Sequence, residues 1–191
     1  MMEKALIGYG GHAKEVMAQM GTKLKCFVDD EYVTDDCQPL SSFNPLKFEV
    51  MVAISNPQDR LAIIKRLPKE TQYFTFIHQT SLILDNVKIG CGSFIGAYSI
   101  LTTNIRIGNH ALLNRSNHVG HDCRIGNFFS MMPGSIISGN VIIGDNVYIG
   151  TNSSIKEKMK ICNNVTIGLN TGIVKNINEC GTYVGNPTKK I

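Results

Sequence analysis

One histidine of this chain stands directly beside a carboxylate, and its position within a regular repeat makes it a candidate general base. His121 precedes Asp122, and the pair follows Val119 and Gly120. An imidazole titrates near neutral pH, and an adjacent carboxylate can fix its tautomer and stabilise its protonated form. Because His121 lies two residues after an aliphatic position of the repeat, we expect it to be exposed on a turn. A solvent-facing turn histidine without function remains the alternative.

The other histidines and the cysteines indicate weaker chemistry. His118 and His121 could form a metal pair, but no third ligand is evident and zinc usually takes three or four ligands. We therefore expect no bound metal. We expect His110 to be a surface turn residue. Cys123 stands two residues before an aliphatic position, which predicts a core residue at a corner and not a reactive thiol.

A six-residue period runs through the second half of the chain and must position these side chains. Every sixth residue from Ile83 to Ile173 is Ile, Leu, Val or Met, and the residue two before it is usually small or β-branched. A period of six is not that of an α-helix, and it predicts a parallel β-helix with three strand-and-turn units in each coil, about five coils in all. Glycine often follows the aliphatic residue, and we expect glycine or asparagine there to supply the turn.

The register of this repeat has no insertion between Ile83 and Ile173. The coils therefore carry no long loops, and such a smooth prism offers no deep pocket of its own. This predicts an active site in a groove between subunits.

The first eighty residues follow a different pattern. Apolar runs alternate with helical patterns, which predicts a small parallel sheet, a half-Rossmann-like α/β domain. We expect this domain over residues 1–80 and the β-helix with its C-terminal cap over residues 81–191. The expected strands cover 5–7, 25–28, 50–54 and 73–77, and the expected helices cover 13–20 and 58–67.

A glycine-rich turn links the first expected strand to the first expected helix. Gly8, Gly10 and Ala13 have the spacing of a nucleotide-binding turn, and Asp29 and Asp30 end the second strand, where a ribose or base is often held. Such glycines let backbone N–H groups approach a pyrophosphate at a helix N-terminus. The segment is about half of a dinucleotide fold, which favours a mononucleotide. A glycine turn without a ligand remains the alternative.

Composition excludes several classes of protein. The net charge of +4 is too small to favour nucleic-acid binding. Residues 156–191 hold six lysines and two glutamates, either a solvated basic end or a site for an anionic cofactor. No segment approaches the length of a membrane span, no signal-peptide pattern is present, and the six cysteines form no C-x-x-C pair. We expect a cytoplasmic protein.

These motifs together resemble one family, and the resemblance covers essentially the whole chain. The family is the left-handed β-helix sugar acyltransferases of the sialic-acid O-acetyltransferase type, which includes the bacillosamine-pathway and perosamine N-acetyltransferases. The motifs that carry the resemblance are Gly8-Tyr9-Gly10-Gly11-His12-Ala13-Lys14, Phe27-Val28-Asp29-Asp30, Ala53-Ile54-Ser55-Asn56, Asn114 with His121-Asp122-Cys123, and Val184-Gly185-Asn186-Pro187.

The resemblance implies a homotrimer that uses acetyl-CoA, with active sites at subunit interfaces. It implies His121 as catalytic base, supported by Asp122. It implies that a nucleotide-linked sugar contacts Gly10, Gly11, His12, Asp29, Asp30, Ser55 and Asn114. It implies that the backbone at Gly139 faces the thioester oxygen and that Ser130, Thr151 and Leu169 line the CoA groove. The chain departs from some relatives, which have His in place of Ser130 and Gly in place of Ser55, and His118 is not a general feature of the pattern.

The leading hypothesis is an acetyl-CoA-dependent N-acetyltransferase acting on a nucleotide-linked 4-amino-4,6-dideoxy sugar in cell-surface glycan biosynthesis. An O-acetyltransferase acting on sialic acid or a related sugar is the second. A non-enzymatic scaffold and a zinc-dependent β-helix hydratase are the remaining alternatives, and the histidine spacing does not favour the hydratase.

Overall fold

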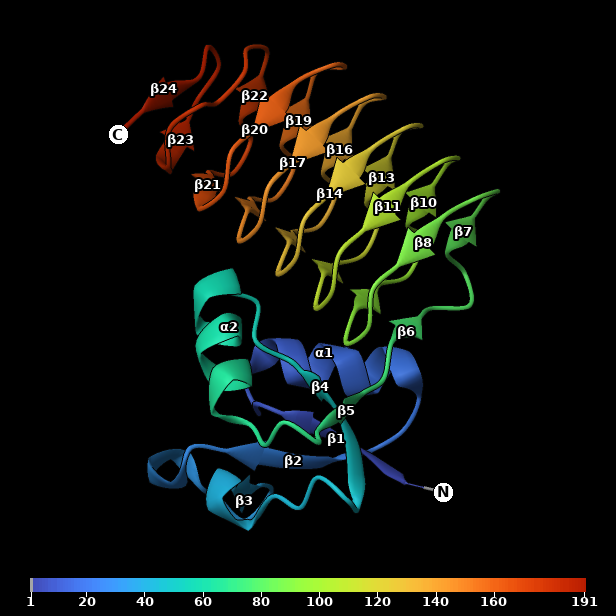
Figure 1. The fold of residues 1–191 in the computed structure, drawn as a ribbon, viewed down its shortest axis with the longest axis vertical. Helices are drawn as coiled ribbons and strands as arrows, with labels where there is room; N and C mark the ends of the chain where they lie inside the picture. The colour runs from blue at the N-terminus through green and yellow to red at the C-terminus, as the bar shows by residue number, and fades with distance from the viewer. Residues whose placement is uncertain (1) are drawn as a thin grey trace.

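The computed structural model describes residues 2–191, which form an α/β domain and a triangular β-helix joined along one face of the prism (Figure 1). The N-terminal sheet has the parallel strand order β3-β2-β1-β4-β5. Its elements are β1 (Glu3–Ile7), α1 (Gly11–Met20), β2 (Lys25–Val28), β3 (Gln38–Pro39), β4 (Phe48–Val52), α2 (Pro57–Arg66) and β5 (Gln72–Tyr73), with short 3-10 turns at Asp30–Tyr32 and Leu40–Ser42.

Local sequence accounts for both helices. Helix α1 ends at Gly21, whose φ of 66° lets the backbone turn back and donate to the last carbonyls of the helix. Helix α2 begins after Asn56, whose side chain accepts hydrogen bonds from two backbone N–H groups of the first turn, and Pro57 occupies the first helical position. Both expected helices and the first three expected strands are confirmed, with ends shifted by one or two residues.

The fourth expected strand, over 73–77, is wrong as a single element. Gln72–Tyr73 joins the N-terminal sheet, whereas Phe76–Ile77 forms β6 and pairs with the β-helix strand β9. Phe74 is buried in the core beneath α1, so the chain leaves one sheet and enters the other within three residues. The β-helix therefore begins at Phe76, earlier than the expected boundary at residue 81.

The β-helix has three faces of parallel strands, and the chain visits each face once in every coil (Figure 1). The first face contains β6 (Phe76–Ile77), β9 (Phe94–Ile95), β12 (Leu112–Leu113), β15 (Ser130–Met131), β18 (Tyr148–Ile149), β21 (Val165–Ile167), β23 (Gly181–Val184) and β24 (Lys189–Lys190). The second face contains β7 (Leu82–Ile83), β10 (Ile100–Leu101), β13 (His118–Val119), β16 (Ile136–Ile137), β19 (Ser154–Ile155) and β22 (Gly172–Ile173). The third face contains β8 (Lys88–Ile89), β11 (Arg106–Ile107), β14 (Arg124–Ile125), β17 (Ile142–Ile143) and β20 (Lys160–Ile161).

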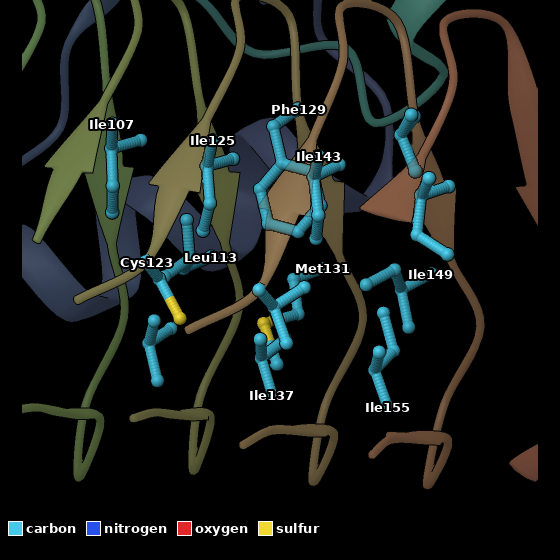
Figure 2. Packing of buried hydrophobic residues seen from close by; sticks show 14 of the residues in the cluster. Ile107, Leu113, Cys123, Ile125, Phe129, Met131, Ile137, Ile143, Ile149 and Ile155 are labelled. Atoms are coloured by element: carbon cyan, nitrogen blue, oxygen red, sulfur yellow. The ribbon is translucent and has the colours of Figure 1, made fainter. Parts of the chain in front are cut away.

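The six-residue aliphatic series forms the core of the prism, as predicted. Its members from Ile95 to Ile173 are buried, and Ile83 and Ile89 pack against the same cluster at the open end. Figure 2 shows these side chains stacked in columns from one coil to the next, with Cys123 among them. Cys123 is fully buried, which confirms its expected place in the core.

The turns differ from the expectation in one respect. The residue with positive φ stands three positions after the aliphatic residue, as at Asp122 (φ 61°) and Asn140 (φ 60°). The glycine that directly follows the aliphatic residue is needed for close approach between coils: a Cβ on Gly126 would lie 2.6 Å from the carbonyl carbon of Gly144. The prediction that this glycine supplies the turn was wrong, because the coil spacing and not the turn excludes a side chain there.

The two ends of the first face are covered differently. Phe94 and Leu112 point outward from β9 and β12 and are buried against Leu6, Ala13 and Val16 of the N-terminal domain. At the far end β23 and β24 form an antiparallel pair, and Tyr183 packs against the prism core. This hairpin is the C-terminal cap expected of a solenoid.

Candidate functional site

The His121–Asp122 pair lies on the corner that joins the second and third faces, on the turn between β13 and β14. The Nδ1 atom of His121 is 2.7 Å from Oδ2 of Asp122, and the two side chains are 57% and 44% exposed. The hydrogen bond with His121, and after it one from Asn104, hold the pKa of Asp122 below its usual value. An ionised Asp122 accepts a hydrogen bond from the Nδ1–H group of His121, which leaves the lone pair on Nε2 free to take a proton.

Gly139 occupies the position of His121 one coil later, and the two residues are in contact. A Cβ on Gly139 would lie 2.6 Å from Nε2 of His121, so any other residue there would displace the imidazole from this position. The backbone N–H of Gly139 donates no hydrogen bond within residues 2–191. On the corner between the third and first faces, the equivalent N–H of Asn127 donates to Asp145 at 2.6 Å. The corner that carries His121 therefore presents a free donor beside the imidazole.

A cavity of about 410 Å³ opens at the carboxyl ends of β1, β2 and β4. Its lining includes Gly8, Gly10 and Asp29, which the glycine motif and the acidic pair predicted, and it adds Tyr9, Tyr32, Thr34 and Ile54. Gly8 adopts a φ of 105°, which favours glycine, and a Cβ there would lie 3.2 Å from the Ala53 carbonyl oxygen. A Cβ on Gly10 or Gly11 would meet nothing within 4 Å, so the space at the N-terminus of α1 is open to a ligand.

The two carboxylates of the acidic pair, Asp29 and Asp30, have different surroundings. Asp29 lines the cavity and accepts hydrogen bonds from both terminal nitrogens of Arg66, one of them at 3.1 Å. Asp30 lies outside the lining of this cavity and accepts from the Ser41 backbone N–H at 3.2 Å. The bonds from Ser41 lower the pKa of Asp30. Of the two predicted carboxylates, the structure brings only Asp29 to the cavity.

His12 and Asn114 meet at the junction between α1 and the prism. Asn114 donates to Glu15 at 3.3 Å, and His12 Nδ1 is 3.9 Å from the same carboxylate. The His12 ring lies edge-on to Phe94, and neither of its nitrogens has a hydrogen-bond partner among residues 2–191. Burial lowers the pKa of His12 to about 4, so the ring is neutral at physiological pH. The structure thus brings these two predicted residues, one from α1 and one from the prism, to the same carboxylate of Glu15.

Ser55 and Ser130 lie beneath α2 and contact each other. The Ser130 hydroxyl is fully buried, donates to the Ser55 carbonyl at 2.7 Å and accepts from Arg60 at 2.8 Å. The expectation that Ser130 lines a CoA groove does not fit this placement, because the N-terminal domain covers β15 at that point. Ser55 itself lines a second cavity of about 320 Å³ beside Tyr148.

The remaining two residues expected in the CoA groove lie on the corner between the first and second faces. Thr151 and Leu169 stand one coil apart there, and Leu169 is 76% exposed. Gly139 lies across the second face from them, on the corner with His121. Within one chain, Gly139 is therefore the one predicted acetyl-CoA residue beside His121, and Ser130, Thr151 and Leu169 lie elsewhere on the prism. Figure 1 shows that the turns between the second and third faces point away from the N-terminal domain.

The burial of two side chains, those of His110 and Arg60, was not predicted from the sequence. His110, expected on the surface, is buried in a turn with a φ of 56°, stacked on Phe128 and edge-on to Tyr73. That expectation was wrong because the docked N-terminal domain covers the turn. Arg60 is almost fully buried, and its five N–H groups reach only backbone carbonyls and Ser130. No sequence signal separates Arg60 from the exposed cations of its helix.

Residues 2–191 contain no group of three or more His, Cys, Asp or Glu side chains arranged to hold a metal ion. Neither helix in this range has the length and apolar character needed to cross a bilayer.

Comparison with known proteins places this arrangement among solved acetyltransferase structures. WeeI from Acinetobacter baumannii AYE is 29% identical with a TM-score of 0.89, and the match covers 100% of both chains. The acetyltransferase domain of PglB from Neisseria gonorrhoeae FA1090, in complex with acetyl coenzyme A, is 25% identical over 100% of both chains with a TM-score of 0.68. PerB from Caulobacter crescentus, in complex with CoA and GDP-perosamine, is 19% identical over 100% of this chain and 98% of that one, with a TM-score of 0.79. No protein-family model and no curated protein sequence matches the chain.

The fold and these structural relatives confirm the resemblance drawn from the motifs. The chain has the left-handed β-helix fold of the hexapeptide-repeat sugar acetyltransferases, with a Rossmann-like N-terminal domain, and it resembles these structures over its whole length.

Proposed function

We propose that this protein transfers the acetyl group of acetyl-CoA to the amino group of a nucleotide-linked 4-amino-4,6-dideoxy sugar. The observation that carries the proposal is the exposed His121–Asp122 pair packed against Gly139 in a chain that also has an open cavity at a glycine-rich turn. A general base by itself could activate many acyl acceptors, with or without a nucleotide. The cavity, separate from the base, favours an acceptor that carries a nucleotide.

The chemistry follows from the two free atoms at the corner. The sugar amine attacks the thioester carbonyl carbon, and Nε2 of His121 removes a proton from the attacking nitrogen. Asp122 stabilises the imidazolium through its 2.7 Å hydrogen bond. The unpartnered N–H of Gly139 is suited to hold the oxygen that becomes negative. Collapse releases the CoA thiolate, which takes up the proton. No covalent enzyme intermediate is needed, because binding both substrates together supplies proximity.

The N-terminal cavity has the chemistry of a nucleotide diphosphate site. The backbone N–H groups at the start of α1 have no side-chain cap, and the first turn contains no acidic residue. A helix N-terminus with free N–H groups attracts phosphate oxygens. Asp29, held by Arg66 at the cavity wall, offers carboxylate oxygens to a ribose or base. GDP-perosamine in PerB and dTDP in the AntD N-acyltransferase from Bacillus cereus are ligands of this class.

The separation of cavity and base supports an active site shared between subunits of a homotrimer. The cavity and the predicted contacts His12 and Asn114 lie on the side of the prism that the N-terminal domain covers, whereas His121 occupies the corner between the other two faces. A second copy of the chain would bring a cavity or a CoA-binding corner to His121. We also propose that the enzyme acts in the cytoplasm, where acetyl-CoA and nucleotide sugars are present.

Steady-state assays test the proposal directly. Purified protein is incubated with acetyl-CoA and a panel of UDP-, dTDP- and GDP-linked 4-amino sugars, with free sialic acid as the O-acetylation substrate. We expect CoA release and a mass increase of one acetyl group on one of the amino sugars. Acetylation of sialic acid alone would favour the O-acetyltransferase hypothesis instead.

Substitution of the base provides the matched test. We expect His121→Ala to lower kcat by about a hundredfold or more, because general-base catalysis contributes at least that much. The exposed side chain makes no contact that the fold requires, so the melting temperature should be unchanged. Asp122→Asn should lower kcat by a smaller factor. Near-normal turnover by His121→Ala would reject His121 as the base.

A further inference from the structure

A chain of side-chain hydrogen bonds runs along the corner that carries His121 and ends on its carboxylate partner. Nδ2 of Asn86 donates to Oδ1 of Asn104 at 2.7 Å, and Nδ2 of Asn104 donates to Oδ1 of Asp122 at 3.2 Å. The other carboxylate oxygen of Asp122 meets Nδ1 of His121. Asn86, Asn104 and Asp122 occupy the same turn position in three successive coils, with φ values of 56°, 58° and 61°.

The donors and acceptors of these side chains determine the direction of the hydrogen-bond series. Because the Asn104 oxygen accepts from Asn86, the NH₂ group of Asn104 must face Asp122. Each oxygen of the Asp122 carboxylate then has one donor, an amide on one side and an imidazole on the other. A carboxylate held at both oxygens cannot rotate away from the imidazole without losing a hydrogen bond.

Asparagine pairs at other corners show what is particular to this one. Asn146 donates to Asn164 at 3.2 Å on the corner between the third and first faces, and Asn152 donates to Asn170 at 3.1 Å on the corner between the first and second faces. These pairs end on an amide with no histidine beside it. Hydrogen-bonded asparagine side chains in successive coils, here called an amide ladder, therefore occur at all three corners. At the corner of His121 the ladder continues into a carboxylate–imidazole pair.

We propose that Asn104 is a positioning residue for the reaction: it orients the Asp122 carboxylate so that Nδ1 of His121 keeps its proton and Nε2 remains the base. The proposal rests on the proposed function, since it assigns a role within that catalytic pair. Asn104 does not touch the reacting atoms and acts through Asp122.

The charged groups near the His121–Asp122 pair determine which residues a new charge at position 104 would affect. Arg124 on β14 donates to the Asn104 carbonyl at 2.7 Å and stands close enough to Asp122 to favour its ionised form. Along the same corner, Asp85 lies two coils before His121, and Glu157 and Lys158 lie in the second coil after it. Gly139 and Asn140, in the coil between, carry no charge. A new carboxylate at position 104 would thus act mainly on Asp122 and His121.

Asn104→Gly and Asn104→Asp test the proposal, with Asn164→Gly as the matched control. Glycine accepts the positive φ at positions 104 and 164 without strain, so each glycine variant removes one ladder amide and keeps the turn. We expect Asn104→Gly to lower kcat by about tenfold, with the KM for acetyl-CoA unchanged, because a misoriented base loses catalysis and not binding. Asn164→Gly should retain activity within about twofold, because its ladder leads to no catalytic group.

Asn104→Asp gives a readout that a purely structural role would not move. A second carboxylate beside Asp122 favours the protonated imidazole, so the acidic limb of the pH profile of kcat/KM should shift to higher pH by about half a unit or more. Equal activity of the Asn104→Gly and Asn164→Gly proteins, or an unshifted profile for Asn104→Asp, would overturn the proposal. His121→Ala is measured in parallel: activity in that variant rejects the base itself, whereas an inactive His121→Ala with normal Asn104 variants rejects only the role of Asn104.

Discussion

At the scale of single residues, burial distinguishes His12 and His110 from the exposed His121. His12 and His110 are held in apolar surroundings where the docked domain meets the prism, and each retains an unpartnered ring nitrogen. Burial, with a smaller contribution from the charge of Arg60, lowers both pKa values to about 4. Both rings therefore stay neutral in the folded protein under conditions in which an exposed histidine would take up a proton.

This burial predicts a loss of stability in acid. Because the folded pKa of His110 lies below that of the unfolded chain, the unfolded state binds the proton first as the pH falls. Its contribution is fully present above about pH 6.5 and is lost towards pH 4. We expect His110→Asn, which accepts the same positive φ, to reduce the slope of unfolding free energy against pH by up to about 1.4 kcal/mol per unit in this window.

Urea unfolding at pH 7.5, 6.0 and 5.0 measures that slope for the native protein and the variant. His118→Asn, at an exposed position of the second face, is the control and should leave the slope unchanged. Parallel slopes for native protein and His110→Asn would show that His110 does not contribute.

At the scale of secondary structure elements, α2 is attached to the prism through one buried cation. Arg60 donates to the His110 and Phe129 carbonyls and the Ser130 hydroxyl on the prism, and to the Ile54 and Ser55 carbonyls of its own domain. Burial lowers the pKa of Arg60 to about 9, which still leaves it charged at neutral pH. The guanidinium thereby joins the end of β4, which borders the proposed nucleotide cavity, to two coils of the β-helix.

Removing this cation should loosen the junction. We expect Arg60→Met to destabilise the protein by about 3 kcal/mol, because the His110 and Ile54 carbonyls and the Ser130 hydroxyl oxygen lose the donor they have among residues 2–191. We also expect faster hydrogen exchange in residues 53–60 and a higher KM for the nucleotide sugar. Arg60→Lys should be intermediate, since an ammonium offers fewer donors in a different geometry. Lys65→Met, an exposed change on the same helix, should alter neither stability nor exchange; equal effects from both changes would argue against the clamp.

At the scale of the whole molecule, the proposed trimer predicts complementation between inactive subunits. Gly10→Asp places a carboxylate in open space at the N-terminus of α1, where it should repel a pyrophosphate and still suit the helix. His121→Ala leaves the cavity intact. If each active site combines the cavity of one subunit with the base of another, a trimer that contains both kinds of subunit keeps one intact site of three. The isolated mixed oligomers should therefore recover about a third of native activity.

Co-expression with two affinity tags isolates the mixed oligomers, and an assay of each parent alone provides the baseline. The Gly10→Asp protein should melt at or above the native temperature, which excludes misfolding as the cause of its inactivity. Mixed oligomers no more active than their parents would indicate a site within one subunit.

The amino-acid sequence by itself was sufficient to predict the β-helical prism, because the six-residue aliphatic period reflects a local geometry that repeats in every coil. For the same reason it placed Cys123 in the core and His121 on an exposed corner beside Asp122. It also indicated the glycine turn, whose residues lie within one strand–helix unit. The glycines after the aliphatic positions were misread because their constraint comes from the next coil, eighteen residues away.

Only the tertiary structure decided what the docking of the two domains covers. His110 and Ser130 look like surface positions of the repeat, and they are buried because α2 and the N-terminal sheet lie over the first face. Arg60 and the ladder through Asn104 depend on partners 18 to 70 positions away, and no local pattern encodes such contacts. The division of the residues 73–77 between two sheets has the same origin, since strand pairing is a property of the assembled fold.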